Sequence, residues 1–235
     1  MNEVLSMKVA TSVLGRVDGS SVSSLDNFKI ISSVTGPIEP KPRQEMPTMA
    51  SLEIIVRPAI GVSGTREKLL EDKLRSVLQS VIIRHKYPRQ LIQITVQFLI
   101  TEQSTEQSNT ARKDYDSVFT ATDLAEALNS CYYALVDANV ALYRSFAALS
   151  MSLPGYKVNP LLRDLKASKS HYVVCFDIAD QIAEKLLLLD AEGSFTEEEV
   201  YIVIDKAKEE CQRIHRETQR KALTEKIERD TVWSS

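Results

Sequence analysis

Residues Phe28–Leu99 read FKIISSVTGPIEPKPRQEMPTMASLEIIVRPAIGVSGTREKLLEDKLRSVLQSVIIRHKYPRQLIQITVQFL. The first β-rich run, 28–34, predicts a strand that ends at the turn signal Gly36-Pro37. The segment 38–47 is rich in proline and predicts a loop, since proline cannot donate a backbone hydrogen bond. A second β-rich run, 52–56, predicts the next strand.

Apolar residues between Thr65 and about Arg84 recur at i, i+3, i+4 and i+7, from Leu70 to Ile82. This spacing is typical of a helix with one buried face. A third β-rich run follows at 91–99. The whole stretch therefore predicts strand, loop, strand, amphipathic helix and strand.

Composition limits the kinds of protein to be considered. The chain has 235 residues, 43% of them hydrophobic, enough for one large or two small cores. The net charge of −3 gives no overall attraction to nucleic acid, so any such contact needs a local patch. The three cysteines lack metal-ligand spacing and predict reduced, buried thiols. Without a secretory signal or an apolar run of roughly 20 residues, a soluble intracellular protein is expected, with no membrane contact.

The second half of the chain predicts a further set of elements. The polar segment 101–117 has no periodicity and predicts a flexible insertion. Asp190 to Gly193 is read as a hairpin or turn, and Thr196 with Glu199 as a capping box. The expected elements are a helix at 123–139, strands at 147–153, 172–177 and 185–189, and a long C-terminal helix at 196–229, whose end beyond about Arg216 is expected to be solvated or to reach a partner.

The words SVTGPIEPKPRQE, LEIIVRP, GTREKLLEDKLRSVL and PRQLIQITVQFL closely resemble the RNase PH family. Within that family they look most like fungal-type ring subunits of the eukaryotic RNA exosome. The resemblance covers roughly residues 12–215 and is densest before residue 100. It implies an α/β fold (α+β, mixed sheet) with duplicated strand–helix–strand modules and a long C-terminal helix. We expect one RNase PH-like domain over 1–235, with modules at about 11–100 and 118–230.

The resemblance also locates a phosphate site. Active members hold phosphate on a Gly-Gly-Thr-Arg stretch at a helix start, where free N–H groups and an arginine fork bind anions. Anchored on the following ALVDA, this chain has Asp123 in place of the threonine and Leu124 in place of the arginine. We expect Asp123 to cap the helix with Glu126, and to repel phosphate by about 1–4 kcal/mol. The alternative is that Asp123 serves some other chemistry.

The acidic residues of active members, Asp-Leu-Asp-Tyr-x-Glu-Asp, are matched best here by DLKASKS at 164–170. Asp164 fits the first carboxylate or an ordinary surface aspartate, whereas Lys166 and Ser170 replace the others. Gly64-Thr65-Arg66 repeats part of the phosphate motif, but at the start of the first helix, where the family has no catalytic loop. We read it as a helix start capped by Ser63 or Thr65.

Eight lysines and arginines against three acids between residues 57 and 89 predict a basic patch. The resemblance implies that this helix contacts RNA or a neighbouring subunit. The alternative is a solvated helix face on which Glu71 and Arg75 pair. The candidate RNA-binding residues are Lys68, Arg75, Arg84 and Arg89.

The resemblance implies a non-catalytic structural subunit of the exosome core ring that supports 3′-to-5′ RNA processing and degradation, including ribosomal RNA maturation. Its expected partners are the other RNase PH-like subunits of a six-membered ring, cap proteins, the hydrolytic nuclease and RNA. No catalytic residue, metal or cofactor is expected. Nucleus, nucleolus and cytoplasm are the expected locations. Two alternatives stay open: a residual phosphorolytic or altered-chemistry nuclease using Asp123 and Asp164, and a free homodimer outside the complex.

Overall fold

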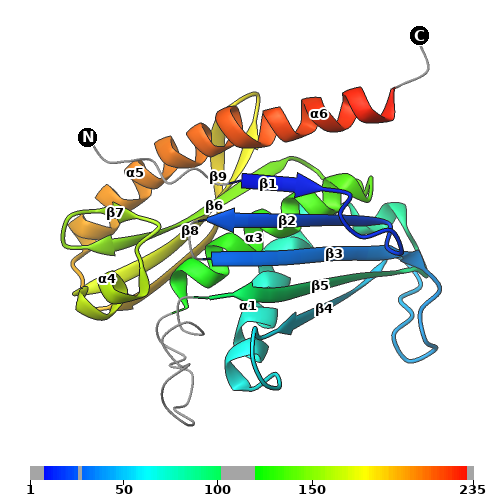
Figure 1. The fold of residues 1–235 in the computed structure, drawn as a ribbon, viewed down its shortest axis with the longest axis horizontal. Helices are drawn as coiled ribbons and strands as arrows, with labels where there is room; N and C mark the ends of the chain where they lie inside the picture. Colours follow the sequence, from blue (N-terminus) through cyan, green and yellow to red (C-terminus); the bar gives the residue numbers. More distant parts are fainter. Residues whose placement is uncertain (1–7, 26–27, 102–119, 232–235) are drawn as a thin grey trace.

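The first-half stretch folds in the predicted order in the computed structural model, which describes residues 8–25, 28–101 and 120–231 (Figure 1). The insertion predicted at 101–117 therefore lies outside the described residues, except for Thr101. Two strands that the sequence did not predict come first. The elements of this half are β1 (Lys8–Thr11), β2 (Gly19–Leu25), β3 (Phe28–Ile38), β4 (Ser51–Arg57), α1 (Thr65–Val81), the short 3₁₀ helix η1 (Arg84–Lys86) and β5 (Leu91–Ile100).

These strands form a five-stranded sheet in the order β1-β2-β3-β5-β4. All neighbours are antiparallel except β4 and β5, which run parallel because α1 connects them as a crossover. The prediction that Gly36-Pro37 ends the first strand was wrong. β3 continues to Ile38, since a register shift between Thr35 and Ile38 lets the ladder with β5 accommodate the two residues.

The second half forms a four-stranded antiparallel sheet in the order β7-β6-β8-β9. The predicted helix and three strands are confirmed within a few residues. Its elements are α3 (Ala121–Asp137), β6 (Ser145–Leu153), β7 (Lys157–Val158), α4 (Leu162–Ala167), β8 (Ser170–Ala179) and β9 (Ile182–Gly193). The turn predicted at 190–193 was wrong, because Asp190 pairs with Val173 and Gly193 with Ser170. Here α3 precedes its sheet, so the strand–helix–strand order of β4-α1-β5 does not recur within it.

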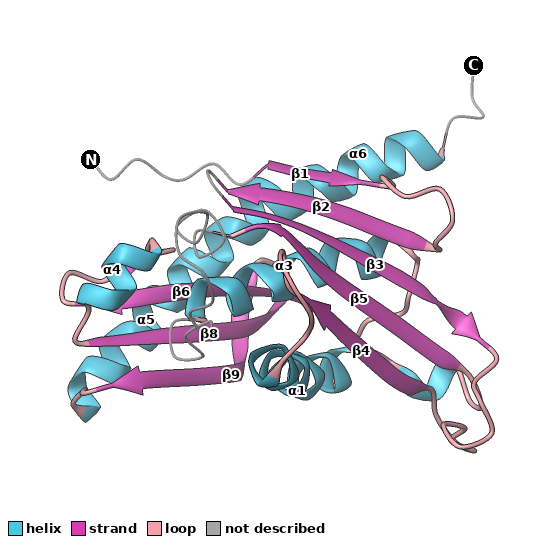
Figure 2. Cartoon of the chain, turned by 60° about the horizontal axis from the view of Figure 1, so that its bottom comes forward, coloured by secondary structure: helices cyan, strands magenta, loops and turns pink. Residues whose placement is uncertain are grey.

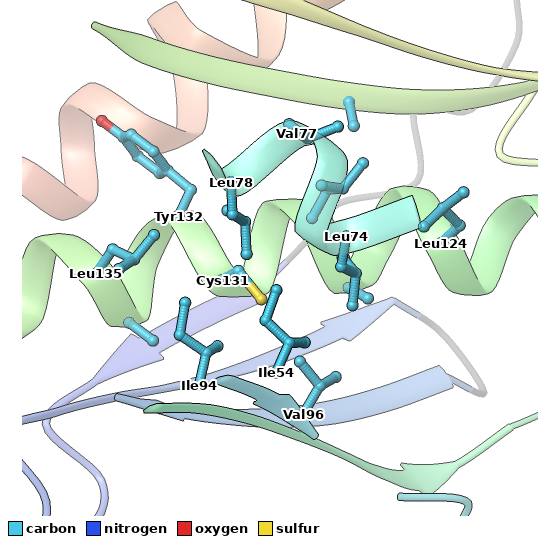
Figure 3. Packing of buried hydrophobic residues seen from close by; sticks show 14 of the residues in the cluster. Ile54, Leu74, Val77, Leu78, Ile94, Val96, Leu124, Cys131, Tyr132 and Leu135 are labelled. Carbon is cyan, nitrogen blue, oxygen red and sulfur yellow. The ribbon is translucent and has the colours of Figure 1, made fainter. Parts of the chain in front are cut away.

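The two sheets enclose α1 and α3, and a further helix covers the outer face of the second sheet (Figure 2). Alternate residues of β6 point to the two opposite faces of the second sheet. Phe146 and Ala148 join the core that contains α1, α3 and the first sheet, while Ala147 and Leu149 join a second core with α5 (Glu197–Ile214). Covering both faces explains why β6 is largely apolar. Figure 3 shows the first core, and the three cysteines are buried free thiols, as predicted.

The predicted C-terminal helix is confirmed as α5, the π-helical turn η3 (His215–Gln219) and α6 (Arg220–Asp230). Thr196 and Glu199 form the predicted capping box. Positions 203, 207, 211, 215 and 219 are all buried. On a straight α-helix, residues four apart rotate by about 40° per step, so the wider π turn helps to keep this row on one face. Gln219 Nε2 donates to the Phe146 carbonyl at 2.8 Å within that turn.

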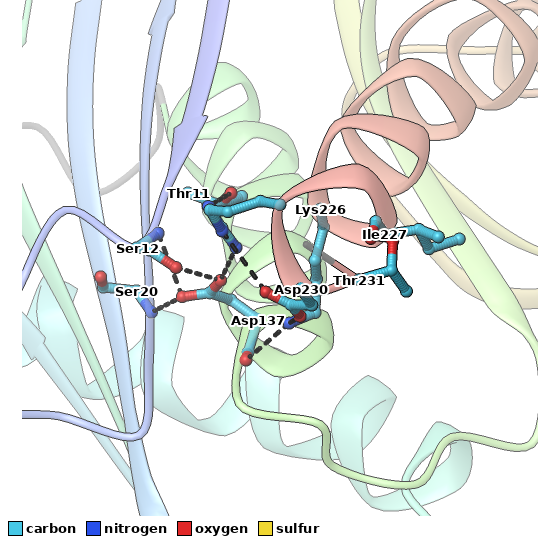
Figure 4. A network of polar contacts seen from close by, with 9 residues as sticks. Thr11, Ser12, Ser20, Asp137, Lys226, Ile227, Asp230 and Thr231 are labelled. Atoms are coloured by element: carbon cyan, nitrogen blue, oxygen red, sulfur yellow. Dashed lines mark hydrogen bonds and ion pairs between the residues drawn. The ribbon is translucent and has the colours of Figure 1, made fainter. Parts of the chain in front are cut away.

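The end of this helix is held by the chain itself, around the carboxylate of Asp137 at the end of α3 (Figure 4). That carboxylate accepts hydrogen bonds from the Ser12 N–H at 3.0 Å and the Ser20 N–H at 2.9 Å. Arg229 of α6 donates to it at 3.1 Å, and Lys226 donates to the Asp137 carbonyl at 3.3 Å. Part of α6 is therefore docked onto β1 and α3, which the fading apolar stripe did not predict.

Gly19 lets β2 approach α3 closely. A Cβ added there would lie 2.2 Å from the Ala138 N atom and 2.5 Å from the Ala134 carbonyl oxygen. Both are backbone atoms, so a side chain at this position requires the helix or the strand to move.

We predict that Gly19→Ala lowers the free energy of unfolding by about 1–3 kcal/mol or more, because the methyl group meets backbone atoms. Urea denaturation of the purified chain measures the loss. Gly15→Ala is the matched control, since a Cβ there meets nothing within 4 Å. Equal effects of the two substitutions would contradict the close packing of β2 on α3.

Candidate phosphate site and basic surface

The first turn of α3 contains the two residues aligned with the phosphate motif. Leu124, at the position of the motif arginine, is a fully buried core side chain. The N-cap residue is Thr120, whose side chain makes no capping hydrogen bond. The prediction that Asp123 caps the helix with Glu126 was therefore wrong: Asp123 is the third helical residue, and it points to another partner.

That partner is Arg66, near the start of α1. Its Nη2 donates to Oδ2 of Asp123, and its Nη1 donates to Oε1 of Glu67 at 3.1 Å. The Arg66 and Asp123 side chains are only 5% and 10% exposed. The guanidinium also lies 5.9 Å from the ring centroid of Phe98, within cation–π range. A buried ion pair thus joins the starts of α1 and α3.

The Gly64-Thr65-Arg66 stretch is a helix start, as predicted, but neither Ser63 nor Thr65 caps it. Gly64 is the N-cap residue, and its N–H donates to the Glu67 carboxylate at 2.6 Å. The Ser63 hydroxyl instead donates to the Val56 carbonyl at 3.0 Å. The sequence signal for the ion pair was the presence of an acid, Asp123, in the first turn of a helix that is otherwise mostly apolar, since a buried carboxylate needs a cation.

The charges at the contact between the starts of α1 and α3 do not favour binding of an anion. One arginine faces two carboxylates, Glu67 and Asp123, so the three groups carry a net charge of −1. The helix N-terminus stabilises Asp123 in addition to Arg66. An incoming phosphate would compete with a carboxylate that is already in place.

We predict that Arg66→Met lowers the free energy of unfolding by about 3–5 kcal/mol, because it leaves the buried Asp123 carboxylate without its cation. Adding Asp123→Leu to that variant should restore most of the loss. A double-mutant cycle in urea measures the coupling. Lys221→Met is the control, because that side chain is exposed on α6 and a surface charge contributes little. A loss no larger than the control's would contradict the ion pair.

One turn further along α3, Glu126 is buried, and no cation among the described residues forms an ion pair with it. Burial raises the pKa of its carboxyl group from 4.5 to about 7. The folded chain therefore retains this proton over a range in which the unfolded chain has released it. Between pH 4.5 and about 7 this group lowers the free energy of unfolding by about 3 kcal/mol as the pH rises.

We predict that Glu126→Gln becomes more stable relative to the wild-type chain as the pH rises, because glutamine stays neutral. The difference in the free energy of unfolding should grow by about 2–3 kcal/mol between pH 5 and pH 8 in urea titrations. The same substitution at the exposed Glu228 serves as control and should show no such growth. A constant difference for Glu126→Gln would mean that its carboxyl is ionised at both pH values.

Asp164 lies near this region but has a structural role. The Thr122 hydroxyl of α3 donates to the Pro160 carbonyl at 2.9 Å, which brings the start of α4 close to the start of α3. Partial burial would raise the pKa of Asp164, but hydrogen bonds from Lys157 and from the Leu161 N–H lower it overall. Asp164 accepts the Leu161 N–H at 3.1 Å in the first turn of α4, which fits the surface aspartate interpretation.

Two of the four candidate RNA-binding residues lie on α1. Lys68 is exposed and pairs with Glu71 at 2.6 Å. Arg75 donates to the Leu52 carbonyl at 2.9 Å, while Glu71 accepts the Val56 N–H at 3.0 Å. Glu71 and Arg75 therefore satisfy backbone groups on the outer edge of β4 and do not pair with each other, which protects that edge from other strands.

The other two candidates lie beyond the opposite end of α1, which is about 20 Å along the helix axis from Lys68. Arg84 donates from Nε to the Ala50 carbonyl at 2.9 Å, and its half-buried position lowers its pKa. Arg89 is exposed and its Nε donates to Glu45 at 2.5 Å. The four residues thus form two separate surfaces, and the prediction that they bind RNA stays a prediction.

The structure adds two rings to the second surface. Tyr143, which is 57% exposed, lies beside the exposed His85, with ring centroids 6.1 Å apart. These residues are 58 positions apart in the chain, so the sequence showed no aromatic residue among the charges.

Among the residues that the structure describes, no group of three or more histidine, cysteine, aspartate or glutamate residues could hold a metal ion. None of the helices in the same residues is long and apolar enough to cross a membrane.

Comparison with known proteins gives a family match over residues 3–141, more than half of the chain, to the family described as "3′ exoribonuclease family, domain 1" of RNase PH. The exosome complex component RRP46 of Saccharomyces cerevisiae is 39% identical over 216 residues, covering 89% of this chain and 92% of that protein. Exosome complex component rrp46 of Schizosaccharomyces pombe is 29% identical over 202 residues, covering 83% and 80% of the two chains.

A more distant relative is the exosome complex component Rrp41 of Archaeoglobus fulgidus, 26% identical over 233 residues, covering 94% of this chain and 83% of that protein. Among solved structures, rice Rrp46 superimposes with a TM-score of 0.74 at 21% sequence identity. That match covers 92% of this chain and 96% of the rice chain, and it supports the fold.

Proposed function

The chain belongs to the RNase PH family of 3′ exoribonucleases, and we propose that it serves as a non-catalytic structural subunit of an exosome core ring. In this role it supports 3′-to-5′ processing and degradation of RNA, including ribosomal RNA maturation. It contributes a ring position and surfaces along the RNA path. No reaction step is assigned to it.

The relatives support the ring assignment. Two fungal proteins that match most of the chain are named as exosome components of the RRP46 type. The identity of 39% to one of them, over nearly the whole of both chains, favours a common role. The archaeal relative is likewise named as an exosome component.

The ion pair between Arg66 and Asp123 is the observation that carries the non-catalytic part of the proposal. At the helix start where active relatives hold phosphate, a leucine is buried in the core and a carboxylate is paired with an internal arginine. Catalysis by phosphorolysis needs an open anion site with free donors. A site whose arginine is already paired with the protein's own carboxylates is expected to serve packing.

The partners we propose are the other RNase PH-like subunits of a six-membered ring, cap proteins, the hydrolytic nuclease of the exosome, and RNA. Nucleus, nucleolus and cytoplasm are the proposed locations, on family grounds. A free homodimer is the competing arrangement, and the mass of the assembled species distinguishes the two.

We predict that the purified chain releases no nucleoside diphosphate from 3′-labelled single-stranded RNA in the presence of phosphate. A phosphorolytic member of the family is the positive control. Asp123→Asn and Asp164→Ala should leave this blank result unchanged, with thermal unfolding used to confirm that both variants fold. Phosphate-dependent release that either substitution abolishes would establish the residual nuclease instead.

The same preparation tests the structural part. Mixed with its candidate ring neighbours, the chain should enter a complex with the mass of a closed ring, and leaving it out should prevent closure. Recovery of the chain as a homodimer that excludes the neighbours would overturn the ring assignment.

A further inference from the structure

The segments that follow α1 and α3 lie side by side and are fixed by backbone hydrogen bonds. The Ile83 N–H donates to the Ala141 carbonyl, and the Tyr143 N–H donates to the Val81 carbonyl, both at 2.9 Å. The Tyr87 hydroxyl accepts the Ala141 N–H at 3.0 Å. A β-bridge between residues 82 and 142 completes the contact. Residues 81–89 and 140–144 therefore present their side chains from a defined backbone.

Two exposed rings stand on this backbone. The Tyr143 hydroxyl lies 3.3 Å from Nδ1 of His85, and the two ring planes are tilted by 46°. Tyr143 is 57% exposed, so much of its ring is open to solvent. A side chain that is exposed yet held through its backbone and its hydroxyl group loses little further freedom on binding a flat partner.

The charged residues of the two segments themselves are all basic. The two segments contain Arg84, Lys86, Arg89 and Arg144 and no acidic residue. Arg89 and Arg144 are paired with acids from other segments. Lys86 is exposed and forms no ion pair with any residue in the part of the chain that the structure describes. Arg84 is anchored to the Ala50 carbonyl.

We propose that His85 and Tyr143 form a stacking platform for an unpaired base of single-stranded RNA, with Lys86 and Arg84 holding the flanking phosphates. This inference rests on the proposed function and deepens it, because it assigns RNA contact to particular residues. Every base has a π-face, so such a platform binds RNA without reading its sequence. The adjoining cations attract the phosphate backbone and make binding dependent on salt.

The four basic residues predicted from sequence lie on two separate surfaces, and the surfaces differ in what those residues contact. Arg75 is engaged with the edge of β4, and Lys68 with Glu71. Arg84 and Arg89 instead belong to the segment that carries His85. The platform therefore combines exposed planar groups with cationic groups.

We predict that Tyr143→Leu weakens binding of a fluorescently labelled 12-mer of oligouridylate by about 5- to 100-fold, measured by anisotropy on the full-length chain. Tyr143→Phe keeps the ring and should stay within twofold of the wild-type chain. The slope of log affinity against log salt should be unchanged in Tyr143→Leu, because stacking releases no counterions. Lys86→Ala should instead reduce the magnitude of that slope by about 1.

Thermal unfolding of each variant checks that the fold is intact, and closed-ring assembly is measured in parallel. The platform is overturned if the wild-type chain does not bind the oligomer, or if Tyr143→Leu and Tyr143→Phe bind equally well. It is also overturned if Tyr143→Leu keeps RNA affinity but loses ring assembly, which would make these residues a subunit contact. If stacking is confirmed while the chain fails to join a ring, the proposed function fails and the platform stands.

Discussion

The fold depends on the burial of α3 between the two sheets. Fifteen of its 17 residues are buried, so polar side chains on this helix need partners inside the protein. Asn129 meets this need with a pair of hydrogen bonds to the backbone of Ala148, at 2.8 and 2.9 Å. Ser130 is matched by Ser21 of β2. Asp137, at the helix end, is satisfied from two strands and from α6. These contacts fix how the helix is oriented between both sheets.

The same constraint shapes the candidate phosphate site. Asp123 and Glu126 lie on the same buried helix, one turn apart, yet within the described residues a cation pairs with Asp123 and none pairs with Glu126. The pairing of Asp123 with Arg66 makes this helix start a contact between α1 and α3. Glu126 instead retains its proton at a higher pH than usual. The chemistry of this region is therefore governed by how the helix is buried.

Several elements of the first half could be predicted from the sequence because each has one face in water. α1 has a single apolar stripe, and β4 and β5 alternate, so periodicity identifies them. β2 could not be found in this way, since GSSVSSL buries serines against α3 and shows no apolar alternation. The segment 190–193 has turn-like residues, but pairing with β8 overrides them. Likewise, the sequence located Asp123 and Leu124, whereas Arg66 and the ring pair of His85 and Tyr143 depend on contacts more than 50 positions apart.

The docking of α6 has a consequence for how the fold is reached. Arg229 contacts Thr11 across 218 positions of sequence, and the same side chain reaches Asp137. Contacts between residues so far apart require a large loop to close before they return any stabilisation. The sheets and α3 can assemble from contacts of shorter range. The contacts of Arg229 with Thr11 and Asp137 are therefore expected to form late in folding. Until these contacts form, β1 and the end of α3 are not covered by α6. A partially folded chain then exposes at this place the kind of surface that chaperones and proteases recognise.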